Sequence, residues 1–148
     1  MYVFAKLMLV VSSLLASAPL FASTSYVEAL HCHSRFVSDL GEVNAALLCR
    51  GVESSNATAV NNCVSEVKVR TDDGKVIAIL CQGIDYRITT ATLNCFDQSV
   101  ESMPALDAAI LCQRTDYRAY TAKMNCLSAA KDSMSNEAGT KLCGGIAN

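Results

Sequence analysis

Eight cysteines are the residues of this chain with the clearest chemistry. They stand at Cys32, Cys49, Cys63, Cys81, Cys95, Cys112, Cys126 and Cys143. The numbers of residues between neighbouring cysteines alternate, at 16, 13, 17, 13, 16, 13 and 16. In a chain of only 148 residues, so many cysteines in even number indicate a disulfide framework formed in an oxidising compartment.

The cysteines belong to an internal repeat. Every second cysteine returns after 31 or 32 residues, a period typical of stacked helical or helical-turn units. The flanking residues repeat as well. Leu precedes Cys49, Cys81, Cys112 and Cys143, and Asn precedes Cys63, Cys95 and Cys126.

Each repeat is expected to contain two short helices. Val76, Ile79 and Leu80 follow the i, i+3, i+4 spacing of a buried helical face, and Pro104 suits the first turn of a helix. Glycines two residues after a cysteine are typical helix ends, and they stand at Gly51, Gly83 and Gly145, with Arg114 in the third copy. Threonines at one repeated offset are predicted to cap the following helix, and these are Thr58, Thr90 and Thr121.

These patterns predict an all-α fold of four tandem helical hairpins, each of about 31 residues and each held by a disulfide, stacked as a short solenoid. The units fall at about 26–51, 57–83, 89–114 and 120–145, within a single domain of residues 23–148. Lys141 replaces the Leu47, Ile79 and Ile110 of the other copies. A polar residue there is suited to a solenoid end.

Symmetry favours one pairing of the cysteines. In an antiparallel helical hairpin, facing residues lie at equal depth from the turn, and four pairs have midpoints that fall on turn signals such as Leu40-Gly41 and 71–74. The favoured pairs are Cys32–Cys49, Cys63–Cys81, Cys95–Cys112 and Cys126–Cys143. A rival register pairs Cys49–Cys63, Cys81–Cys95 and Cys112–Cys126, which mismatches the depths by ~7 Å. A third possibility is that the 13-residue intervals are continuous helix.

Two equivalent triplets in neighbouring repeats are the candidate binding site. Tyr and Arg are the residues that most often anchor protein contacts, and repeat proteins commonly bind with one row of loops. The candidate residues are Asp85, Tyr86, Arg87, Asp116, Tyr117 and Arg118. The alternative is structural: the Asp accepts backbone N–H bonds, the Tyr covers the hairpin and the Arg pairs with the Asp. The first copy departs, with Glu53-Ser54-Ser55.

We expect no metal site, no cofactor and no catalytic residues. His31 and His33 flank Cys32, and on a helix they point about 200° apart, too far to hold one ion. Motifs of a nucleophile elbow, a Cys-x-x-Cys redox pair or a phosphate-binding glycine loop are lacking. The chain is therefore not expected to be an enzyme.

The first 22 residues predict export. Lys6 precedes an apolar stretch from Leu7 to Leu15, followed by small residues, which is the pattern of a signal peptide cleaved near Ala22. Without Lys6, eleven basic and 14 acidic residues remain, with no basic stripe, so nucleic acid is not an expected partner. The mature chain is expected to have no membrane span and to be secreted or periplasmic.

The sequence leaves three functions to compare. The first is a binding or structural module in the periplasm or outside the cell, which contacts a protein, peptide or glycan through its row of loops. The second is a secreted effector or inhibitor whose disulfides resist proteolysis. The third is a hydrolase with a site assembled between repeats.

Overall fold

The computed structural model describes residues 23–145, and over that range the fold is all-α. The predicted signal peptide of residues 1–22 lies outside the described residues. The eight described helices are α1 (Ser23–Leu40), α2 (Glu42–Cys49), α3 (Ala57–Lys68), α4 (Gly74–Cys81), α5 (Thr89–Ser99), α6 (Ala105–Cys112), α7 (Tyr117–Ala130) and α8 (Asn136–Gly144). The predicted fold class of repeated, disulfide-stapled hairpins is confirmed.

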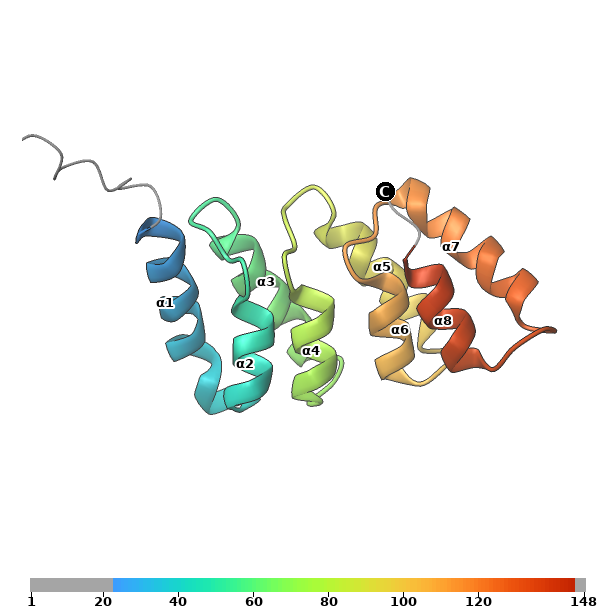
Figure 1. The fold of residues 1–148 in the computed structure, drawn as a ribbon, viewed down its shortest axis with the longest axis horizontal. Coiled ribbons are helices and arrows are strands. Elements are labelled where there is room, and N and C mark those ends of the chain that lie inside the picture. The colour runs from blue at the N-terminus through green and yellow to red at the C-terminus, as the bar shows by residue number, and fades with distance from the viewer. Residues whose placement is uncertain (1–22, 146–148) are drawn as a thin grey trace, which may run out of the picture.

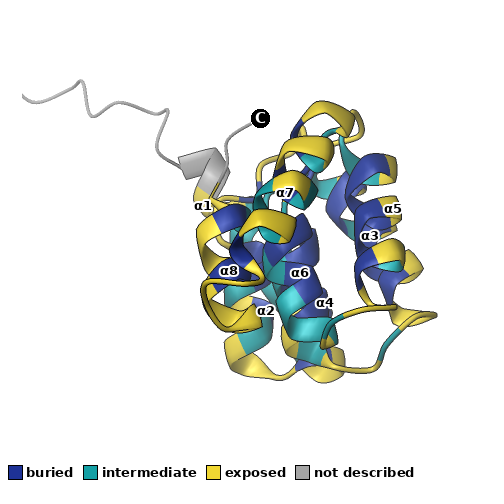
Figure 2. Ribbon diagram, turned by 90° about the vertical axis from the view of Figure 1, so that its right-hand side faces the viewer, coloured by how far each residue is buried: buried dark blue, intermediate teal, exposed yellow. Residues whose placement is uncertain are grey.

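The hairpins stack side by side as an elongated array (Figure 1). The short helices α2, α4, α6 and α8 form one row in which each packs against the next. The helices α3, α5 and α7 form a second row on one side of the first, as the view along the array shows (Figure 2). Each short helix also packs against the helix that precedes it in the chain, so every helical hairpin spans both rows except the first, where α1 lies beside α2.

The core lies between the two rows because the short helices α2, α4 and α6 are largely apolar. Leu48, Leu80 and Leu111 occupy equivalent positions and are fully buried. Alanines such as Ala78 and Ala109, also fully buried, allow neighbouring helices to approach closely. Each such helix has only eight or nine residues, too few to be stable alone in water. Stacking and the disulfides therefore hold them.

The disulfides join the two helices of each hairpin, in the register that equal depth favours. They are Cys32–Cys49, Cys63–Cys81, Cys95–Cys112 and Cys126–Cys143, and the Cα atoms of each pair lie 5.6 or 5.7 Å apart. The rival register is wrong because the bridges join other pairs of cysteines. The continuous helix is wrong because a loop separates the two cysteines of each 13-residue interval. These loops cover residues 50–56, 82–88 and 113–116.

The predicted threonine caps are wrong. Thr58, Thr90 and Thr121 lie inside α3, α5 and α7. In α7 the acidic residue of the loop makes the cap instead: Asp116 Oδ1 accepts hydrogen bonds from the backbone N–H groups of Arg118 and Ala119, at 2.8 and 2.7 Å. A carboxylate is as good a cap as a threonine hydroxyl, and it stands earlier in the chain, so the helix begins earlier than predicted.

The third repeat ends its short helix without glycine. Gly51 and Gly83 have φ of +75° and +63°, the left-handed region that glycine adopts at no steric cost. Arg114, at the same offset, has φ of +52°, a conformation that costs a residue with a Cβ roughly 1–2 kcal/mol. Gly145 directly follows the last residue of α8, as predicted for a helix end, but with φ of −74° it does so without a left-handed conformation.

The fourth repeat ends the stack. Leu142 is equivalent to the buried Leu111 yet is 60% exposed, because no further helix packs against α8 among the described residues. Lys141, predicted to mark this end, is exposed and pairs with Glu137 at 2.6 Å. Within residues 23–145, no helix combines the length and the apolar character needed to cross a membrane.

Candidate functional site

Three loops lie in a row along one edge of the array. They follow α2, α4 and α6 and comprise residues 50–56, 82–88 and 113–116; we call them the loop edge. Figure 1 shows them at the top, whereas the turns inside each hairpin lie at the bottom. Because each short helix ends at a cysteine held by its disulfide, the loops start from fixed points at equal depth in successive repeats.

A polar groove of about 520 Å³ runs across the start of the three loops. Its lining comprises Arg50, Gly51, Asn56, Gln82, Gly83, Gln113 and Arg114. The lining thus carries two guanidinium groups and three side-chain amides, and it carries no carboxylate. Such a surface offers many hydrogen-bond donors and a positive charge.

The groove residues of the second and third repeats contact one another. Arg50, Gln82 and Gln113 each directly follow the second cysteine of their hairpin. The Gln113 amide Nε2 donates to Gln82 Oε1 at 3.0 Å, which joins the third repeat to the second. The Arg114 side chain lies over Gly83, where an added Cβ would stand 3.7 Å from the Arg114 Cδ. The left-handed backbone at Arg114 thus accompanies a guanidinium laid back across the groove.

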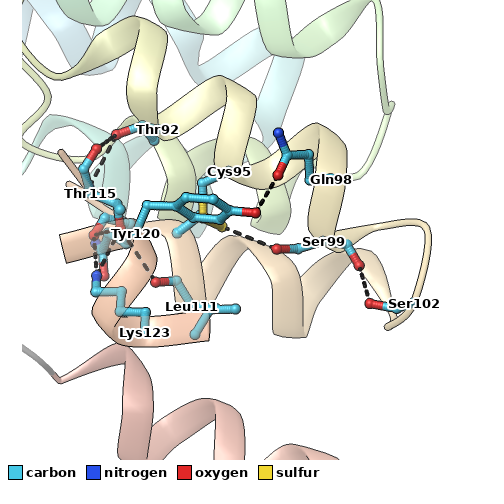
Figure 3. The surroundings of a disulfide bond; sticks show 11 residues. Thr92, Cys95, Gln98, Ser99, Ser102, Leu111, Thr115, Tyr120 and Lys123 are labelled. Atoms are coloured by element: carbon cyan, nitrogen blue, oxygen red, sulfur yellow. Dashed lines mark hydrogen bonds between the residues drawn. A yellow bond between two sulfur atoms is a disulfide. The ribbon is translucent and has the colours of Figure 1, made fainter. Parts of the chain in front are cut away.

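Beneath the third loop lies a buried polar network (Figure 3). The Thr92 hydroxyl accepts from the Thr115 N–H and donates to the Thr115 C=O, both at 3.2 Å. The Lys123 Nζ donates to Thr115 Oγ1 at 2.8 Å and approaches the Gln113 carbonyl at 3.5 Å. All three side chains are at most 2% exposed. The network fixes the backbone from Gln113 to Thr115 and so positions the Gln113 side chain in the groove.

Lys123 is an ionisable group in the core. Desolvation lowers the pKa of its ammonium group below the usual lysine range, and the negative charge of Asp116 opposes that shift in part. The equivalent residues of the first three repeats are Ala29, Val60 and Thr92. The repeat therefore does not require a lysine at this position. Lys123 occurs where the third loop places the polar Thr115 beside it.

Within the two predicted triplets, the aspartates have a structural role, whereas the tyrosines and arginines are exposed. Asp85 accepts two backbone N–H bonds within its loop and Asp116 accepts two from the first turn of α7, which is the structural role considered for them. Tyr86 and Tyr117 do not cover the hairpins, since they are 59% and 61% exposed. Arg87 is exposed on the second loop, and Arg118 is exposed in the first turn of α7.

The predicted residues flank the groove and do not line it. One contact links a triplet to the neighbouring repeat: Asn94 Nδ2 donates to the Tyr117 hydroxyl at 3.4 Å. Sequence reasoning missed the lining residues Arg50, Gln82, Gln113 and Arg114. A signal for them exists in the same repeat alignment, because the position after the second cysteine is polar in three copies and Gly144 in the fourth.

His31 and His33 do not form a site together. They lie on either side of the bridged Cys32 in α1, with His31 exposed and His33 half-buried. Within the described part of the chain, no three side chains of His, Cys, Asp or Glu gather as metal ligands would.

The fold and the groove define a small, disulfide-rich, all-helical repeat protein, and its four disulfides are typical of an oxidising compartment. No protein-family model, no curated protein and no solved structure matches the chain. Its function must therefore be inferred from the geometry of its own residues.

Proposed function

We propose that this protein is a binding module of the periplasm or the extracellular space, and that its loop edge holds an extended polypeptide segment with acidic side chains. The observation that carries the proposal is the polar groove across three consecutive repeats, with Arg50, Gln82 and Gln113 at equivalent positions.

The side-chain amides of the groove fit the main chain of an extended peptide. A side-chain amide donates and accepts hydrogen bonds, and an extended peptide presents N–H and C=O groups in alternation along each edge. Packed helices lie about 8–10 Å apart, and an extended chain advances about 3.3 Å per residue. About three peptide residues would therefore span one repeat, and about six would cross the groove.

The charge of the groove selects acidic side chains. Arg50 brings an exposed positive charge to a lining without carboxylates, and a guanidinium binds a carboxylate with two parallel hydrogen bonds. Tyr86 and Tyr117 stand exposed beside the groove, where their rings can add contact area at low entropic cost. Guanidinium groups and amides do not exchange protons near neutral pH, so the proposed activity is recognition and not catalysis.

The test begins with the mature chain from Ser23 and a displayed library of random linear peptides. We expect acidic peptides to be enriched and to bind less tightly as salt is raised, because exposed charge pairs are screened. The double variant Gln82→Ala/Gln113→Ala should lose about tenfold or more in affinity by titration calorimetry, the scale of two lost hydrogen bonds.

Two matched controls accompany this variant. Asn62→Ala removes an exposed amide from α3, away from the groove, and should leave affinity unchanged. Replacing Tyr86 and Tyr117 by Ala should cost about 2 kcal/mol if they are anchors, whereas Ser54→Ala/Ser55→Ala in the first loop should not. A library that yields no acidic binder, or equal losses for Asn62→Ala and the glutamine pair, would contradict the proposal.

A further inference from the structure

Both ends of the array carry large apolar side chains that are exposed. Figure 1 shows α1 at one end and the hairpin of α7 and α8 at the other. In α1, Tyr26, Val27 and Leu30 are 66%, 45% and 49% exposed. In α8, the exposed apolar side chain is Leu142. Exposed apolar groups that face the direction in which the repeats stack are suited to contact with a further unit.

Leu142 occupies a position that is an interface in every other repeat. Its equivalents Leu48, Leu80 and Leu111 are fully buried, in short helices that each pack against the short helix of the next repeat. The leucine is kept in the fourth repeat, although the residue before it changes from Leu or Ile to Lys141. A terminal unit that met only solvent would be expected to have a polar residue there as well.

The two ends match in depth. Leu142 directly precedes the second cysteine of its hairpin, and Leu30 stands two residues before the first cysteine of its own. Both leucines therefore lie within about one helical turn of a bridge, and the bridges set the hairpins at one depth. The two charged residues of α8, Glu137 and Lys141, pair with each other, so the charge of this helix is balanced where a second helix would approach.

We propose that the mature protein assembles head to tail, with α8 of one copy packed against α1 of the next. Leu142 would then be buried against Tyr26, Val27 and Leu30, and α1 would lie between α8 of the preceding copy and its own α2. A contact between unlike ends leaves one free end on each side, so it builds chains of copies in which the stack of repeats continues from one molecule to the next. The inference does not depend on the peptide groove.

Sedimentation equilibrium of the mature chain from Ser23 tests the assembly between about 10 µM and about 1 mM, because a contact of so small an area is weak. We expect the average mass to rise with concentration beyond that of a dimer. Leu142→Glu and Leu30→Glu should each remain monomeric, since each removes one of the two ends. Val69→Glu, at a valine that is 82% exposed after α3 in the second repeat, is the matched control and should assemble like the parent.

An equal mixture of the Leu142→Glu and Leu30→Glu proteins tests the direction of the contact. Each variant keeps one intact end, so the mixture should form a dimer and nothing larger. Tyr26→Glu, at the most exposed of the three α1 residues, replaces Leu30→Glu if circular dichroism shows that the latter loses helix. The proposal is overturned if the parent stays monomeric at the highest concentration, or if either variant dimerises alone, which indicates a symmetric contact between like ends. It is also overturned if the mixture stays monomeric, or if Val69→Glu abolishes assembly.

Discussion

Three side chains make the surroundings of the third loop different in kind from those of the first two. Val52 and Ile84 are buried at the loop position that Thr115 occupies in the third repeat, and Val60 is buried at the position of Thr92 and Lys123. Apolar packing under the first two loops is thus replaced by hydrogen bonds under the third. A buried polar network specifies one arrangement of the backbone, and here it fixes the residues that contribute Gln113 to the groove.

The buried lysine makes stability depend on pH. Because burial lowers the pKa of Lys123 in the folded protein, the unfolded chain binds more protons between that lowered pKa and the ordinary lysine value. The contribution of Lys123 to the free energy of unfolding should therefore rise with pH through this window. Lys123→Met should remove that rise and stabilise the protein most at the lower pH values of the window.

Urea unfolding of the parent protein and of Lys123→Met, from about pH 7 to about pH 10.5, measures this difference. Comparison of the two proteins cancels the titration of the tyrosines and of the other lysines. Lys75→Met, at an exposed position of α4, is the matched control and should leave the pH dependence unchanged. Parallel curves for the parent and Lys123→Met would show that the buried ammonium group is not destabilised.

At the scale of the helices, the sequence predicts the hairpins but not the residues at which their helices begin. The cysteine spacing predicted the helical hairpins and the favoured pairing, because facing residues in an antiparallel hairpin must lie at equal depth. The caps were misassigned because both Thr121 and Asp116 are good capping residues, and only the backbone shows that α7 starts after Asp116. The groove is not predictable from a single repeat, because a Gln or Arg after a cysteine is chemically ordinary. It becomes a site only when stacking aligns the equivalent positions of three repeats.

Each disulfide should contribute similarly through the unfolded chain. The bridged residues are 17 or 18 positions apart, which corresponds to about 3 kcal/mol when a bridge acts by restricting the unfolded chain. The bridges differ in their surroundings in the folded protein. Cys95 and Cys112 are buried in an interior unit with neighbours on both sides, whereas Cys126 and Cys143 belong to the end unit.

We therefore expect the double variant Cys95→Ala/Cys112→Ala to unfold in one transition at lower temperature, because an interior unit couples both of its neighbours. Cys126→Ala/Cys143→Ala should instead loosen the end unit first and leave residues 26–112 folded. Calorimetry and amide hydrogen exchange of the two variants measure this contrast. Identical exchange patterns in both would contradict a nearest-neighbour stack.

At the scale of the whole molecule, the stack creates the candidate site. No single hairpin contains the groove, since its lining comes from three successive loops, and the loops are aligned only because the disulfides set the hairpins at one depth. The stacked repeats therefore form one continuous loop edge. The fourth repeat departs from the pattern, with Gly144 after its cysteine, an exposed Leu142 and a buried Thr140.

The central claim, that the groove is the binding surface, can be tested within one spectrum. The chain has three glutamines, Gln82, Gln98 and Gln113, and their side-chain NH₂ groups give separate NMR signals. Gln82 and Gln113 line the groove, whereas Gln98 accepts a hydrogen bond from the Tyr120 hydroxyl elsewhere on the surface. On titration with a selected acidic peptide, we expect the Gln82 and Gln113 signals to shift together with one affinity and the Gln98 signal to remain. A binding peptide that shifts Gln98, or leaves Gln82 and Gln113 in place, would contradict the assignment of the groove.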